Sequence, residues 1–150
     1  MKHENSVDWV LKSKIKTALI LLALRQKYLG IKDFGIVDYH RSLKNLFGFE
    51  INYWNCRLNL ERLHEKGLLK KDLVEAIVRN DIVNSKSNVR IERTTRVYKR
   101  LYLPNYKNGD LRRILFRLNY LSKRLLKRNL VEVLTSSVLL TRFCYYLTFR

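Results

Sequence analysis

Residues 51–69 have the sequence INYWNCRLNLERLHEKGLL, and this stretch decides which fold is expected for the whole chain. Cys56, Leu60 and Leu63 recur at intervals of three and four residues, so a helix over 51–66 places them on one side. Polar residues lie at or near the other side, and Gly67 ends the pattern. The stretch therefore predicts a helix with a buried stripe and a polar outer face.

A second helix is expected directly before this one, over 36–47. Four apolar residues are predicted to form its inward side: Val37, Leu43, Leu46 and Phe47. Gly48 then separates the two helices. A helix, a tight turn that contains glycine and a second helix make the outline of a helix-turn-helix unit, here over 36–66.

The N-terminal segment 6–29 predicts one helix with Ser6 as its cap. Within it, residues 17–24 (TALILLAL) are apolar on every side, yet they are too few to span a bilayer, which takes about 20 residues. A helix of this kind is buried by a second subunit or by a later helix of the same chain. Both alternatives remain open.

The C-terminal part, 110–149, predicts two further helices. The first is capped by Asp110 and runs to about residue 129, with leucines on one side and a basic face without acids on the other. The second covers 130–149 and is mostly apolar, but Glu132 and Arg142 disfavour a membrane span. We expect the N-terminal and C-terminal helices to join two copies of the chain.

Residues 68–103 are expected to contain a small β-hairpin. The apolar residues of 69–82 fit a strand and a helix equally well, so periodicity does not decide between them. Residues 84–88 (NSKSN) form a polar turn cluster, and 97–103 (VYKRLYL) predict a strand that Pro104 ends. With this hairpin the chain is expected to be a single, mainly helical domain over 1–150.

The positive charge of the chain requires a polyanionic partner. The 150 residues include 31 Lys and Arg against 13 Asp and Glu, a formal charge of +18. The charge is densest at 86–100 and at 111–128, and two such runs in a small chain favour a binding surface. Nucleic acid is the first candidate partner and an anionic membrane surface the second.

The sequence offers little for catalysis. The histidines are scattered, no His/Cys/Asp set has metal-ligand spacing, and no phosphate-binding glycine loop is found, so we expect no enzyme, metal or cofactor. Cys56 and Cys144 are expected to be buried thiols in a reducing compartment. With no apolar core of a secretory signal at the N-terminus, the expected location is the cytoplasm.

Two strings resemble winged-helix transcriptional regulators of the MarR/PadR kind. Residues 52–71 (NYWNCRLNLERLHEKGLLKK) resemble the recognition helix and the entry into the wing, and 96–115 (RVYKRLYLPNYKNGDLRRIL) are similar to the second wing strand. The resemblance covers roughly 36–129. It departs from the family at Trp54 and Leu58, which fall where polar residues are expected, and in a long wing without a glycine at its tip. The composition also resembles that of small regulators from archaeal viruses or plasmids, which would place the protein in the host cytoplasm.

The resemblance implies a homodimeric winged helix-turn-helix regulator that binds double-stranded DNA. Amide and guanidinium groups of its third helix would read base edges in the major groove. The base-reading candidates are Asn52, Tyr53, Asn55, Arg57, Asn59 and Arg62. The candidates for contacts with the DNA backbone are Arg41, Lys44, Lys86, Arg90, Arg93 and Arg96.

Two other functions stay open at this point. The first is a packaging protein that coats nucleic acid without reading its sequence, because positive charge alone supplies non-specific affinity. The second is a protein of anionic membrane surfaces, with the helix at 111–128 lying on the bilayer. A small-molecule effector is neither indicated nor excluded.

Overall fold

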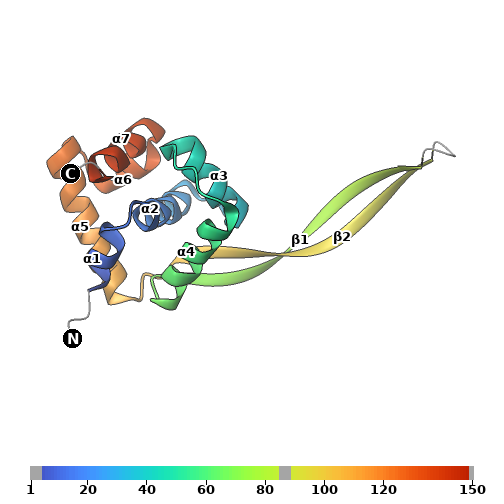
Figure 1. The fold of residues 1–150 in the computed structure, drawn as a ribbon, viewed down its shortest axis with the longest axis horizontal. Coiled ribbons are helices and arrows are strands. Elements are labelled where there is room, and N and C mark those ends of the chain that lie inside the picture. Colours follow the sequence, from blue (N-terminus) through green and yellow to red (C-terminus); the bar gives the residue numbers. More distant parts are fainter. Residues whose placement is uncertain (1–4, 85–88, 149–150) are drawn as a thin grey trace.

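The computed structural model describes residues 5–84 and 89–148, with the backbone path alone for 76–84 and 89–96, and it combines seven helices with one β-ribbon (Figure 1). The elements in chain order are α1 (Ser6–Leu11), α2 (Lys14–Leu29), α3 (Ile36–Phe47), α4 (Tyr53–Glu65), β1 (Leu69–Asn84), β2 (Val89–Pro104), α5 (Gly109–Leu126), α6 (Leu130–Thr135) and α7 (Ser137–Thr148). The expectation of a mainly helical chain with a β-hairpin is confirmed.

Helix α2 is the centre of the helical body. Residues 17–24 are buried on every side, and α1, α3, α4, α6, α7 and β2 of the same chain pack around the helix. Of the two alternatives for this apolar helix, later helices of the chain itself cover it. The prediction that it joins two subunits is therefore wrong for 17–24, because no face of that stretch is left for a partner.

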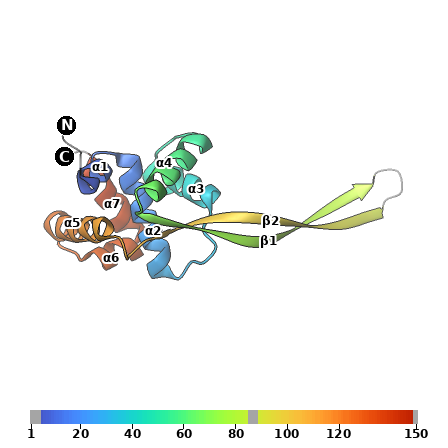
Figure 2. The same ribbon diagram turned by 90° about the horizontal axis from the view of Figure 1, so that it is seen from below.

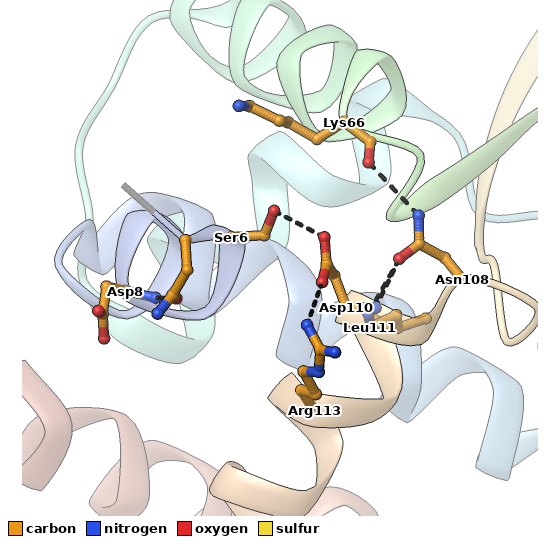
Figure 3. Close-up of polar contacts among 8 residues, drawn as sticks. Ser6, Asp8, Lys66, Asn108, Asp110, Leu111 and Arg113 are labelled. Carbon is orange, nitrogen blue, oxygen red and sulfur yellow. Dashed lines mark hydrogen bonds and ion pairs between the residues drawn. The ribbon is translucent and has the colours of Figure 1, made fainter. Parts of the chain in front are cut away.

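The predicted N-terminal helix is two helices, and both predicted caps are corrected. The Asn5 side chain caps α1, and Ser13 Oγ accepts from Lys16 N at 3.2 Å to begin α2. Asn108 rather than Asp110 caps α5. Ser6 Oγ instead donates to Asp110 Oδ2 at 3.0 Å, so that the two residues expected to be caps tie α1 to α5 (Figure 3).

The predicted C-terminal helices end earlier or are interrupted. Helix α5 ends at Leu126, and Lys127 follows in a left-handed conformation. The segment expected to be one helix over 130–149 is α6 and α7, with Ser136 in extended backbone between them. This break folds α7 back against α2, α3 and α5.

The two strands form a long antiparallel ribbon that projects from the helical body (Figures 1 and 2). Leu69 pairs with Pro104 at the base and Asn84 with Val89 at the far end, and 16 residues per strand reach about 50 Å at a rise of roughly 3.3 Å per residue. Residues 69–82 are therefore strand and not helix. Residues 85–88 of the predicted turn lie outside the described residues.

A buried hydrogen-bond network holds the base of the ribbon. Tyr39 Oη of α3 donates to the Tyr102 carbonyl of β2 at 2.6 Å, and Gln26 Nε2 of α2 donates to the same carbonyl at 3.3 Å and to Tyr39 Oη. Burial raises the pKa of Tyr39, so the hydroxyl keeps the proton that it donates. The two side chains and the Tyr102 carbonyl fix the ribbon to α2 and α3.

Replacing Tyr39 by Phe is expected to lower the free energy of unfolding by about 1–3 kcal/mol, because it leaves buried polar groups with fewer partners. Tyr28→Phe, at an exposed position, is the matched control and should change the free energy by no more than about 0.5 kcal/mol. Urea unfolding followed by circular dichroism measures both. An equal effect of the two substitutions would contradict the role given to the network.

Candidate nucleic-acid interface

The connection between α3 and α4 fixes the angle between these two helices. Gly48 takes the left-handed conformation (φ 71°) that favours glycine, and Phe49 N donates to Leu43 O at 2.9 Å across the turn. Asn52 Oδ1 then accepts from Asn55 N at 2.8 Å and begins α4. The predicted helix-glycine-helix outline is confirmed within one residue or two at each end.

Helix α4 buries the predicted stripe and exposes a mixed face. Cys56, Leu60 and Leu63 are completely buried. Six residues of the helix are exposed: Tyr53, Trp54, Asn55, Leu58, Arg62 and Glu65. Trp54 has 69% of its surface accessible, so this face is as aromatic and apolar as it is polar.

Three of the six candidate base-reading residues make contacts within α4 or cap it. Asn52 caps the helix, and Asn59 Nδ2 donates to Asn55 O at 2.8 Å. The Arg57 guanidinium lies over the Trp54 ring at 5.2 Å from its centroid. The other three, Tyr53, Asn55 and Arg62, are exposed on the outer face.

The candidate backbone contacts divide between α3 and the ribbon. Arg41 and Lys44 are exposed on α3. Lys86 lies outside the described residues. In the register of β2, Arg90 pairs with Val83, Arg93 with Asn80 and Arg96 with Ile77. Because successive strand positions alternate between faces, positions 90 and 96 share one face of the ribbon and position 93 belongs to the other.

A groove of about 520 Å³ lies between α3, α4 and the base of β2. The residues that line it are Ile36, Val37, Tyr53, Arg57, Val97, Tyr98, Lys99 and Arg100. Val37 was expected to face inward, but 52% of its surface is exposed at the mouth of this groove, which corrects that prediction. The aromatic wall contributed by β2 was not identified from the sequence, because the register that carries Tyr98 to α4 is not visible there.

Three ion pairs hold the elements that form the groove. Lys99 Nζ contacts Asp33 Oδ1 at 3.0 Å and Asp38 Oδ2 at 3.3 Å, next to Gly35, where a Cβ would come within 2.5 Å of the lysine Cε. Burial alone would lower the pKa of Lys99, but the hydrogen bonds and charges of the two carboxylates raise it. Lys99 therefore stays protonated, and the two carboxylates balance its charge. The other cations that line the groove are Arg57 and Arg100.

The third ion pair joins α4 to β1. Lys71 Nζ lies 3.2 Å from Glu61 Oε1, and the same carboxylate accepts a hydrogen bond from Tyr102 Oη. Burial would raise the pKa of Glu61, but these hydrogen bonds and the lysine charge outweigh it and lower the pKa. The carboxylate therefore stays charged at neutral pH and ties the middle of α4 to both strands.

Helix α5 forms a second basic surface, at the end of the helical body away from the ribbon (Figure 2). Seven cations are exposed on or just after it: Arg112, Arg113, Arg117, Lys123, Arg124, Lys127 and Arg128. Phe116, 78% exposed, and Tyr120 lie among them. Its leucine side is buried against α1, α6 and α7, so the apolar side that a membrane-surface helix needs is already occupied.

The remaining chemistry agrees with a structural role for both cysteines. Cys56 and Cys144 are buried as expected, and burial raises the pKa of each thiol to about 12. Among residues 5–84 and 89–148, no three His, Cys, Asp or Glu side chains come together to hold a metal ion. In the same residues, no helix has the length and apolar content to cross a membrane.

Comparison with protein-family models, curated protein sequences and solved structures gives no match. The resemblance to winged-helix regulators therefore stays a prediction that rests on the residues quoted for it.

Replacing Asn52 by Ala is expected to lower the free energy of unfolding by about 1 kcal/mol, because the first turn of α4 loses its cap. Asn52→Ser keeps a capping oxygen and should restore most of that loss. Urea unfolding measures both. If the serine variant is stable but binds a DNA duplex selected from a random pool as poorly as the alanine variant, the predicted base contact of Asn52 is supported; if it binds as the unmodified protein does, Asn52 acts as a cap alone.

Proposed function

We propose that the protein is a sequence-specific regulator of transcription that binds double-stranded DNA as a dimer through a winged helix-turn-helix. The observation that carries the proposal is the α3–Gly48–α4 unit, whose second helix exposes Asn55 and Arg62 directly beside a β-ribbon. Such a unit presents its second helix to the major groove. The charge of +18 supplies the attraction to a polyanion.

In this proposal α4 enters the major groove and the other elements hold the DNA backbone. Asn55 suits adenine and Arg62 suits guanine, since each side chain can form two hydrogen bonds with that base. Arg41 and Lys44 of α3 contact phosphates, and the ribbon acts as an extended wing along the duplex. Bound protein then blocks the transcription machinery.

The dimer of this proposal forms through α7. With residues 17–24 buried inside the chain, the C-terminal helix keeps an exposed face of its own. Val138, 68% exposed, and Tyr146 belong to this face, which has a shallow hollow of about 550 Å³. Because a two-fold interface uses the same patch on both subunits, one such face is sufficient.

A packaging function is the second candidate, and the position of α5 favours it. Its basic surface lies at the opposite end of the body from the ribbon (Figure 2), so a single straight duplex along α4 would leave it unused. A protein that coats nucleic acid can use both surfaces, because phosphate contacts require no base sequence.

Alanine at Asn55 or Arg62 is expected to weaken binding to the preferred duplex about 5- to 150-fold, which corresponds to the 1–3 kcal/mol of a bidentate base contact. The preferred duplex is first selected from a random pool, and affinities are measured by fluorescence anisotropy. Asn55→Ala should leave binding to a scrambled duplex nearly unchanged.

Arg41→Ala is the matched control, because a lost phosphate contact weakens binding to every sequence and reduces the salt dependence by about one phosphate. Equal affinity of the unmodified protein for selected and scrambled duplexes would contradict the regulator. If Arg117→Ala combined with Arg124→Ala then weakened all binding, the packaging function would be supported instead.

Val138→Glu is expected to convert the dimer to a monomer, because it places a charge on the exposed apolar face of α7. Sedimentation velocity measures the mass, with Val131→Glu, exposed on α6, as the matched control. A monomeric unmodified protein, or a dimer that survives Val138→Glu, would contradict this interface.

A further inference from the structure

We propose that the groove between α4 and β2 binds an unpaired nucleobase, so that the protein prefers nucleic acid with an exposed base to a fully paired duplex. The base would lie against the aromatic rings of Tyr53 and Tyr98, next to the Trp54–Arg57 stack. The inference rests on the proposed nucleic-acid binding and adds the kind of nucleotide that the site takes.

The aromatic side chains around the groove are unusually open to solvent. Tyr98 has 71% of its surface exposed and Trp54 69%, and Tyr53 is exposed as well. Tyr53 of α4 and Tyr98 of β2 line the groove, and Trp54 lies beside it under the Arg57 guanidinium. Exposed aromatic rings that flank a cationic groove are the common means of binding single-stranded nucleic acid, because every base has a face that stacks.

The charges of the groove fit a nucleotide better than a protein or an apolar ligand. None of its lining residues is acidic, and with Lys99 held by Asp33 and Asp38 the cations that face the groove are Arg57 and Arg100. An arginine over an aromatic ring, as Arg57 lies over Trp54, extends the stacking surface and brings a positive charge to the phosphate.

The groove is also preformed. The Lys99 ion pairs fix β2 to the start of α3, and the Glu61–Lys71 pair fixes α4 to β1. Its volume of about 520 Å³ falls within the range of small-molecule sites. A base that leaves its stack therefore finds a site that needs no rearrangement of the backbone.

In the major groove of a paired duplex, the exposed side chains of Trp54 and Leu58 would meet the polar edges of bases. An indole ring and a leucine side chain satisfy these hydrogen-bonding groups poorly. An unpaired base at the groove beside the Trp54–Arg57 stack avoids that mismatch for the indole ring. Trp54, one of the two residues that depart from the winged-helix pattern, is thereby given a function.

The test compares three ligands of equal length: oligothymidylate, a fully paired duplex and the same duplex with one central mismatch. Trp9→Phe leaves Trp54 as the only tryptophan, and its fluorescence is expected to be quenched by oligothymidylate. When 2-aminopurine is one of the two mismatched bases, its fluorescence should be quenched on binding to the unmodified protein. This signal reports stacking without any substitution in the protein. We expect tighter binding of the mismatched than of the paired duplex.

Tyr98→Ala is expected to weaken binding of oligothymidylate about 5- to 150-fold, the loss of one stacked base. Trp54→Ala removes the ring over which Arg57 lies beside the groove and is expected to weaken this binding as well. Tyr120→Ala removes an exposed aromatic ring from α5 and is the matched control that should leave this affinity unchanged. Thermal unfolding of each variant shows that it is folded, and Trp54→Phe should retain most of the affinity if the variant with alanine is unstable.

Equal binding of paired and mismatched duplexes, or equal effects of Trp54→Ala and Tyr120→Ala, would overturn the inference. In that case sequence-dependent binding of the paired duplex would still support the proposed function. Failure of the protein to bind any of the three ligands would contradict the proposed function itself.

Discussion

Helix α2 has no solvent-facing side over 17–24, and the arrangement of the helices packed around it follows from the need to cover it. An apolar helix of this kind is stable only when neighbours surround it, and here α1, α3, α4, α6 and α7 do so together with the base of β2. The breaks at residues 12–13 and at Ser136 are what allow α1 and α7 to turn back onto α2. The position of α4, and with it the candidate interface, is thus a consequence of burying α2.

The ribbon depends on the same centre. A two-stranded ribbon is at best marginally stable alone, so its base needs other elements. Gln26, which lies on α2 itself, and Tyr39 of α3 hold the Tyr102 carbonyl in the interior. The ion pairs of Lys71 and Lys99 hold the two strands on the surface. The groove beside Tyr98 therefore has walls whose positions are set by buried and surface contacts at once.

The sequence predicted the elements whose signals are local. The Cys56–Leu60–Leu63 stripe and the glycine after α3 identified α3 and α4 almost to their ends. The sequence did not predict the helix caps, because Ser6 and Asp110 are as suited to capping as Asn5 and Asn108. Ser6 and Asp110 instead bond to each other across 104 positions of the chain, a contact that no local signal reveals. Residues 69–82 were undecided for the same reason, since the strand that pairs with them comes later in the chain. The candidate site was predicted only in part, because stacking of Arg57 on Trp54 and the approach of Tyr98 depend on tertiary structure.

In the proposed function, attraction and choice of ligand belong to different surfaces, and the charges of α4 explain why. Its acids and bases nearly balance, with Glu61 committed to Lys71 and Tyr102, and Arg57 committed to Trp54. In the proposed function, the exposed cations of α3 and α5 would be the larger source of attraction, because they would act on phosphates without regard to sequence. What distinguishes α4 and its groove is therefore the combination of an amide, a guanidinium and three aromatic rings. Discrimination at this site must come from hydrogen bonding and stacking, two short-range interactions that salt screens far less than it screens the net charge.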